Sequence, residues 1–194
     1  MTGPLAGVQV LDFGRYIAGP YCAALLAEFG ADVIRIDKRG GSEDRFVGPV
    51  SDRGEGALYL QMNRNKRSLT LDPSSAGGRE IVRRLVERAD VVVANLPAAT
   101  LASMGIDYDS LAAINPRIIL TTSSAYGPTG PMAGYVGFDG VGQAMSGAVY
   151  MTGQPGEPYR AAVNWVDFGT ALHCAFGTMG ALMARQQTGR GQQV

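Results

Sequence analysis

The chain has 194 residues, of which 46% are hydrophobic and 18% are charged, the balance of an ordinary domain with a buried core. Its 17 basic and 17 acidic residues cancel, so no overall positive field attracts nucleic acid or an anionic membrane surface. No apolar stretch approaches the ~20 residues of a membrane helix, and the first residues do not form a secretory signal. We therefore expect a cytoplasmic protein that binds neither nucleic acid nor membranes and holds anionic ligands at a local site.

Short β-branched runs alternate with helical patterns along most of the chain. Strands are predicted at residues 8–13, 31–37, 67–72, 89–95 and 116–123, and helices at 20–30 and 76–88. Pro20 suits the first turn of a helix, and Gly30 suits the residue just after one. The alternation predicts an α/β fold, with a Rossmann-like parallel sheet and helical crossovers.

The last third of the chain has a different pattern. Residues 126–137 are rich in Gly and Pro and predict an irregular loop after the last strand, where ligand contacts are common. Residues 167–187 predict a long helix, in which Gly169, Gly177 and Gly180 favour close packing against another backbone. A further β segment begins at the final GQQV, so we expect the chain to be part of a longer protein.

The first strand, loop and helix, followed by a strand that ends in Asp37, imitate a dinucleotide-binding unit. An acid in that place would meet a ribose hydroxyl. However, the turn FGRYIAGP is not the G-x-G-x-x-G fingerprint, because Gly14 and Gly19 are five positions apart and Pro20 follows. An NAD-dependent oxidoreductase is therefore a minor alternative.

Basic residues gather near the predicted ends of the first strands and before the third. They are Arg15, Arg35, Lys38, Arg39, Arg64, Lys66 and Arg67. Since the carboxyl ends of parallel strands face one crevice, some of these cations could meet phosphate groups there. The alternative is that they are solvated surface charges, as most lysines and arginines are.

Asp167 stands at the start of the long predicted helix. A helix N-terminus favours an ionised carboxylate by about 0.3 to 1 kcal/mol, and such a group can attack an acyl carbon. The same position is also common for an ordinary helix cap. One histidine with Cys22 and Cys174 cannot build a zinc site or a hydrolase triad, so no metal is predicted.

Several motifs follow one another in the order of a known family. They are PLAGVQVLDFGRYIAGP, FGADVIRID, NRNKRSLTLD, ADVVVANLPAATLASMG, NPRIILTTSSAYGPTGP, GFDGVGQAMSGAVYMTG and ARQQTGRGQQV. With them the chain resembles the class III CoA-transferases, which include formyl-CoA transferase, carnitine CoA-transferase and α-methylacyl-CoA racemase. The resemblance implies an acyl-CoA:carboxylate CoA-transferase that works through an aspartyl-CoA thioester on Asp167. Coenzyme A would be a substrate, with no permanently bound cofactor.

Coenzyme A contacts are implied by matching the family's motifs residue by residue. The expected set is Ile17, Ala18, Lys38, Leu71, Asp72, Pro73, Ser74, Asn95, Leu96, Pro97, Val136, Gly137, Phe138 and Asp139. The sequence departs from some members at Ile17, Ser74 and Ser103, where they carry a glutamine, a basic residue and an arginine. Phe138 replaces the histidine of the racemase branch, and a phenyl ring cannot move a proton, so transfer is favoured over racemisation.

The resemblance also implies how the protein is organised. Residues 1–194 would form the N-terminal, CoA-binding segment of the large domain, and a small domain and a C-terminal part would lie outside this chain. Family members form interlocked homodimers, which we expect of the full-length protein. The alternative is a shortened module that binds CoA or assembles with another polypeptide but does not turn over.

Overall fold

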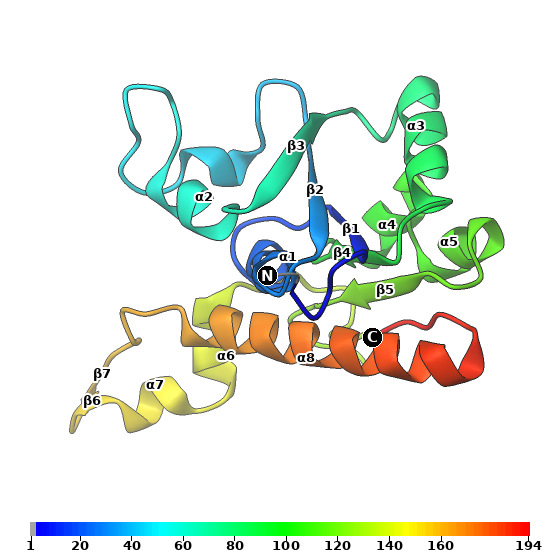
Figure 1. Ribbon diagram of the computed structural model, residues 1–194. Helices are drawn as coiled ribbons and strands as arrows, with labels where there is room; N and C mark the ends of the chain where they lie inside the picture. Colours follow the sequence, from blue (N-terminus) through cyan, green and yellow to red (C-terminus); the bar gives the residue numbers. More distant parts are fainter. Residues whose placement is uncertain (1–2) are drawn as a thin grey trace.

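Five short strands form one parallel sheet in the computed structural model, which describes residues 3–194 (Figure 1). They are β1 (Gln9–Asp12), β2 (Asp32–Asp37), β3 (Lys66–Thr70), β4 (Val91–Ala94) and β5 (Ile119–Thr122), in the order β3-β2-β1-β4-β5. Leu11 of β1 pairs with Ile34 of β2 on one side and with Val92 of β4 on the other. The predicted Rossmann-like α/β fold is confirmed, and the strand order reverses between β1 and β4.

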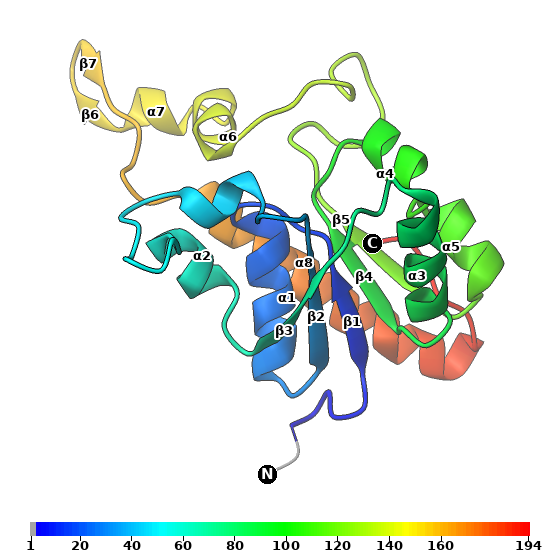
Figure 2. The same cartoon turned by 90° about the horizontal axis from the view of Figure 1, so that it is seen from above.

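Helices cover both faces of the sheet (Figures 1 and 2). One face carries α1 (Ala18–Glu28) and α8 (Trp165–Thr188), and the other carries α3 (Ala76–Val86), α4 (Ala98–Met104) and α5 (Tyr108–Ile114). The remaining elements are the 3-10 helix η1 (Glu43–Phe46), α2 (Ala57–Met62), α6 (Asp139–Met145), α7 (Ala148–Met151) and the hairpin of β6 (Gly153–Gln154) and β7 (Glu157–Pro158). The helices that the sequence did not predict are short, so each shows little periodicity.

Alternating side chains of the strands divide the apolar interior into two cores. Val91 and Val93 of β4 face α1 and α8, whereas Val92 and Ala94 face α3, α4 and α5. All four are at most 1% exposed, as expected for a parallel strand covered on both faces. This double burial explains why ADVVVAN is an unbroken apolar run.

The glycines of α8 do not all behave as predicted. A Cβ at Gly177 would lie 2.7 Å from Val194 Cγ1, so this glycine permits a close approach. A Cβ at Gly169 or Gly180 would have no described heavy atom within 4 Å, so the expectation of tight packing is wrong there. Both glycines lie on the outward side of the helix, away from the sheet that α8 covers.

The last residues extend the sheet beside β5. The Leu120 N–H donates to the Gln192 carbonyl (3.1 Å), and the Val194 N–H donates to the Leu120 carbonyl (2.8 Å). Leu120 and Gln193 form a parallel bridge. The predicted β segment at GQQV is confirmed. Within residues 3–194, no helix has both the length and the apolar character needed to cross a bilayer.

Candidate active site

The segments predicted to contact CoA all follow the carboxyl ends of the parallel strands. Figure 2 shows these strands side by side in the sheet. Ile17 and Ala18 follow β1, Lys38 follows β2, Leu71–Ser74 follow β3, Asn95–Pro97 follow β4, and residues 136–139 end the long loop after β5. Ligands of open α/β sheets bind at this edge, near the point where the strand order reverses. The fold therefore gathers groups that are far apart in the sequence.

Asn95 joins the loops on either side of this reversal. Its Oδ1 accepts a hydrogen bond from the Arg15 N–H (2.7 Å), and its Nδ2 donates to the Arg15 carbonyl (2.9 Å). A Cβ at Gly19 would lie 2.8 Å from Asn95 Oδ1, so only glycine leaves room for this contact. The Asn95 side chain, which follows β4, thus holds the first loop in place through the Arg15 backbone.

A cluster of buried charges supports the same loop. Lys66 Nζ lies 2.7 Å from Asp12 Oδ2, and Arg35 Nη2 lies 2.8 Å from Asp44 Oδ2; Arg35 Nη1 donates to the Gly14 carbonyl (2.6 Å). The side chains of Lys66 and Arg35 are each 1% exposed. Both earlier interpretations of these two cations are therefore wrong: they neither meet solvent nor face a ligand, because buried carboxylates bind them.

Opposite charges decide the ionisation of Asp12. Burial opposes its negative charge, but Lys66 and Arg35 outweigh burial and hold the pKa of Asp12 below its usual value. Asp12 Oδ1 also accepts the Gly14 N–H (2.8 Å). Asp12 is therefore a structural carboxylate that fixes the start of the loop.

Asp37 does not reach the crevice. It is 3% exposed, and its Oδ1 accepts hydrogen bonds from the Ser42 hydroxyl and from the Lys38 N–H (3.0 Å). The NAD interpretation required an acid that could bind a ribose hydroxyl at this place. The structure instead uses Asp37 to hold the turn after β2, so that expectation is wrong.

Asp167 lies in the first turn of α8, where the cap comes from another helix. Asn164, the residue before α8, makes no side-chain capping hydrogen bond. Instead Asp139 Oδ2, from α6, accepts the N–H groups of Val166 (2.9 Å) and Asp167 (3.2 Å). The Asp139 side chain thus caps the N-terminus of α8, a role that the sequence pattern did not reveal.

The ionisation of Asp167 differs from the prediction. Burial, and then the negative charge of Asp139, raise the pKa of Asp167 to about 6. The helix terminus alone would have lowered this pKa, so the expectation of a readily ionised carboxylate is wrong in direction. A half-buried carboxyl group with a pKa near 6 still ionises at neutral pH, and it is more basic than an ordinary aspartate.

Two aromatic contacts join α1 to α8 and the first loop to the start of α6. The Tyr21 and Phe168 rings meet edge to face with centroids 5.2 Å apart, and the Tyr16 and Phe138 rings do so at 5.5 Å. Tyr16 has a φ of 60°, a left-handed conformation that is unfavourable for a bulky residue. Such local strain is found at ligand-binding loops, and here Asp44 holds it by accepting the Tyr16 N–H (3.1 Å).

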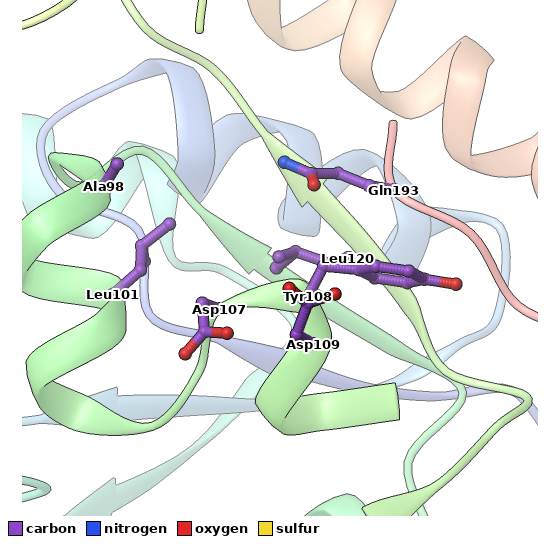
Figure 3. A pocket seen from close by; sticks show the side chains of 7 residues that line it. All are labelled: Ala98, Leu101, Asp107, Tyr108, Asp109, Leu120 and Gln193. Carbon is purple, nitrogen blue, oxygen red and sulfur yellow. The ribbon is translucent and has the colours of Figure 1, made fainter. Parts of the chain in front are cut away.

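A separate pocket, which Asp167 does not line, lies beside β5; Figure 3 shows the side chains that form it. Its walls are Ala98, Leu101, Asp107, Tyr108, Asp109, Leu120 and Gln193. Asp107 caps α5 by accepting the Ser110 N–H (3.0 Å), and the Tyr108 hydroxyl donates to the Gly191 carbonyl (3.0 Å). These polar groups hold α5 and the C-terminal segment against the sheet, so we assign the pocket no part in the chemistry. Residues 3–194 contain no cluster of three His, Cys, Asp or Glu side chains that could hold a metal ion.

Comparison with known proteins gives a consistent result. The chain is 39% identical to a succinate–glutarate CoA-transferase of Agrobacterium fabrum, over 98% of this chain and 50% of that protein. It is also 39% identical to the beta subunit of a succinyl-CoA–L-malate CoA-transferase of Chloroflexus aurantiacus, over 100% of this chain and 48% of that protein. The crystal structure of a CAIB/BAIF family protein from Brucella suis superposes with a TM-score of 0.95 at 39% identity, covering 100% of this chain and 53% of that one.

The chain therefore spans about half the length of the relatives it matches. Residues 5–194 match the family model described as CoA-transferase family III. The sequence resemblance, the parallel sheet and the solved relative agree, and the chain belongs to CoA-transferase family III.

Proposed function

We propose that the protein containing this chain is an acyl-CoA:carboxylate CoA-transferase and that Asp167 is its nucleophile. Membership of the family and the reactions named for its relatives support transfer of CoA. The observation that carries the role of Asp167 is its place in the fold. A half-buried carboxyl group with a raised pKa stands on the first turn of α8, next to the residues that end the loop after β5.

The chemistry needs one carboxylate and no external acid or base. An Asp167 oxygen attacks the thioester carbonyl of the donor, the C–S bond breaks, and CoA leaves as a thiolate, so that a mixed anhydride remains. The thiolate then attacks the Asp167 acyl carbon and expels the donor carboxylate, which gives an aspartyl-CoA thioester. An acceptor carboxylate attacks this thioester and releases the thiolate. Attack of the thiolate on the acceptor side of the second anhydride yields the new acyl-CoA and restores Asp167.

The environment of Asp167 suits both directions of this exchange. A carboxylate with a raised pKa is a stronger nucleophile than an ordinary one, yet it remains a good leaving group when the anhydride collapses. The N-terminus of α8 favours negative charge on the reacting oxygens. Phe138 cannot act as an acid or base, so racemisation at this site is disfavoured.

We propose that CoA lies along the strand ends. Lys38 is exposed enough to meet a phosphate, although Glu43 now pairs with it. Val136 and Phe138 offer exposed apolar surface, at 67% and 61%, while the buried Ile17 and Ala18 can contribute their backbone. Residues 1–194 would be the CoA-binding segment of the large domain of a cytoplasmic protein, and the full-length protein would be an interlocked homodimer.

Mass spectrometry of the intact protein tests the nucleophile. The chain is mixed with a panel of acyl-CoAs, and any adduct is trapped with hydroxylamine or borohydride. We expect an adduct that Asp167→Ala abolishes and that Asp109→Ala leaves intact, because Asp109 is an exposed acid in the first turn of another helix, α5. An adduct that survives in Asp167→Ala would overturn the assignment. A folded chain that binds CoA without any adduct would favour the alternative of a binding module without turnover.

The pH dependence of the adduct is a second test of the same proposal. Attack requires ionised Asp167, whose pKa is raised to about 6, so the rate of adduct formation should rise as pH increases through 6 and level off above it. Single-turnover rates measured in a series of buffers check this. A rate that already has its full value at pH 4.5 would contradict it.

A further inference from the structure

Asp139 and Gln143 form a buried bracket between α6 and the segment that leads into α8. The two residues are 3% and 1% exposed. The Gln143 side-chain amide donates to Asp139 Oδ1, and its Oε1 accepts the Ala161 N–H (2.8 Å). Asp139 Oδ2 accepts the N–H groups of Val166 and Asp167. Both Asp139 carboxylate oxygens thus act as hydrogen-bond acceptors for groups of the protein itself.

Gly142 allows this bracket to form. A Cβ at Gly142 would lie 2.7 Å from Val166 Cγ1, closer than real carbon atoms approach. The small residue therefore lets α6 come near enough for Asp139 to reach the N–H groups of α8. One turn of α6 thus combines a small residue at the contact, an acceptor for the helix N-terminus, and an amide that orients the acceptor.

We propose that Asp139 is a positioning residue for Asp167: it fixes the first turn of α8 and places a second negative charge beside the Asp167 carboxylate. The inference rests on the proposed function in giving Asp167 a catalytic role. Asp139 does not touch the substrate in this arrangement, since both of its oxygens serve the protein. The family resemblance implied a CoA contact at Asp139, and the bracket assigns it a different task.

The surroundings of Asp167 are consistent with this assignment. Burial is the larger cause of the raised pKa of Asp167, and the negative charge of Asp139 is the second cause. Arg160, in the segment before α8, lies over Gly140 of α6, where its Nη1 would be 3.4 Å from a Cβ. His173, the next titratable side chain along α8, is exposed, and its Nδ1 is hydrogen-bonded to the Gly169 carbonyl (2.7 Å). Tyr21 of α1 contacts the first turns of α8 through the Phe168 ring.

The test is a direct titration of the Asp167 carboxyl carbon by NMR in the labelled chain. Asp139→Asn keeps an oxygen that can accept the two N–H groups but removes the charge. In this variant the midpoint of Asp167 should fall from about 6, yet stay above the ordinary 3.8 because burial remains. Asp109→Asn is the matched control and should leave the midpoint unchanged. A folded Asp139→Asn chain with an unchanged midpoint would overturn the inference.

A second variant covers the case in which Asp139→Asn does not fold. Gly142→Ala keeps both carboxylates but forces α6 away from α8. It should also lower the Asp167 midpoint, because the second charge moves away and solvent gains access. If the midpoint stays near 6 in this variant, Asp139 does not act on Asp167.

Adduct formation separates failure of the inference from failure of the proposed function. If the proposed function is correct, the pH at which the acyl-CoA adduct appears should shift downward in Asp139→Asn together with the NMR midpoint. If neither the original chain nor any variant forms an adduct while the Asp167 midpoint still shifts, the effect of Asp139 on Asp167 is confirmed. The role of Asp167 as nucleophile is then not supported. If adducts form with the same pH profile in the original chain and in Asp139→Asn, Asp167 can still be the nucleophile, but Asp139 does not act on it.

Discussion

Two groups of carboxylates lie near the carboxyl edge of the sheet, and they differ in the sign of the charges next to them. Asp12 lies against the cations Lys66 and Arg35, which hold its pKa below the usual value. Asp167 lies against another acid, Asp139, and together with burial this raises its pKa to about 6. Both groups are built from ordinary residues, and the arrangement of charge separates them.

The difference separates carboxylates that stabilise a loop from the carboxylate that we propose to react. Paired charges at the end of β1 keep the first loop in a strained conformation, with Tyr16 at a φ of 60°. The like-charged pair at α6 and α8 leaves one carboxylate poised near neutral pH, where a change of protonation costs little free energy. The raised pKa of Asp167 next to a second acid therefore supports its proposed role as the reacting group.

The largest effect is expected where the paired charges are broken. Asp12→Ala leaves Lys66 and Arg35 buried without this partner, and removal of one member of a buried pair costs about 3–5 kcal/mol. The free energy of unfolding, measured with denaturant, checks this. Arg67→Ala breaks the exposed pair with Asp32 on the same sheet and should leave the denaturation midpoint almost unchanged. Equal losses in the two variants would mean that the buried cluster does not stabilise the loop.

A smaller loss is expected where α6 meets α8. Gly142→Ala adds a carbon that would lie 2.7 Å from Val166 Cγ1, and such overpacking destabilises by about 1–3 kcal/mol. Gly169→Ala is the matched control, because a Cβ at Gly169 meets no described atom within 4 Å and alanine favours a helix. Denaturant unfolding should therefore rank Gly142→Ala below the original chain and Gly169→Ala at or above it. The reverse order would show that the close approach of α6 is not under steric constraint.

The smallest effect should be a gain in stability when Asp167, the proposed nucleophile, loses its charge. The folded state raises the pKa of Asp167 from 3.8 to about 6, so the folded protein binds more protons than the unfolded chain within that window. The contribution of Asp167 to the free energy of unfolding is thus fully present below pH 3.8 and is lost as pH rises through 6. Asp167→Asn should stabilise the fold at pH 7.5 by on the order of 1 kcal/mol, after allowance for partial exposure. Thermal unfolding at several pH values would show the gain shrink towards pH 4, and a gain that does not depend on pH would contradict this cause.

The sequence by itself determined the fold class and most of the elements that carry the site. Unbroken apolar runs such as residues 89–95, separated by helical patterns, predict buried parallel strands, because strands covered on both faces have no polar side. The placement of Asp167 at the start of a long helix was also predictable from local pattern. The position of the edge at which we propose CoA to bind follows from topology once the strands are parallel.

Only the tertiary structure decided which charged groups are buried in ion pairs and which carboxyl group has a raised pKa. Arg35 and Lys66 have no local signal of burial, because their carboxylate partners come from other strands and loops. The pKa of Asp167 was predicted in the wrong direction, because helix geometry is encoded locally. Burial depends on tertiary packing, and the negative charge of Asp139 comes from α6, a separate part of the chain. Electrostatic energies depend on distances in space. For these residues the distances are set by tertiary packing, which cannot be read from the residues next to them in the sequence.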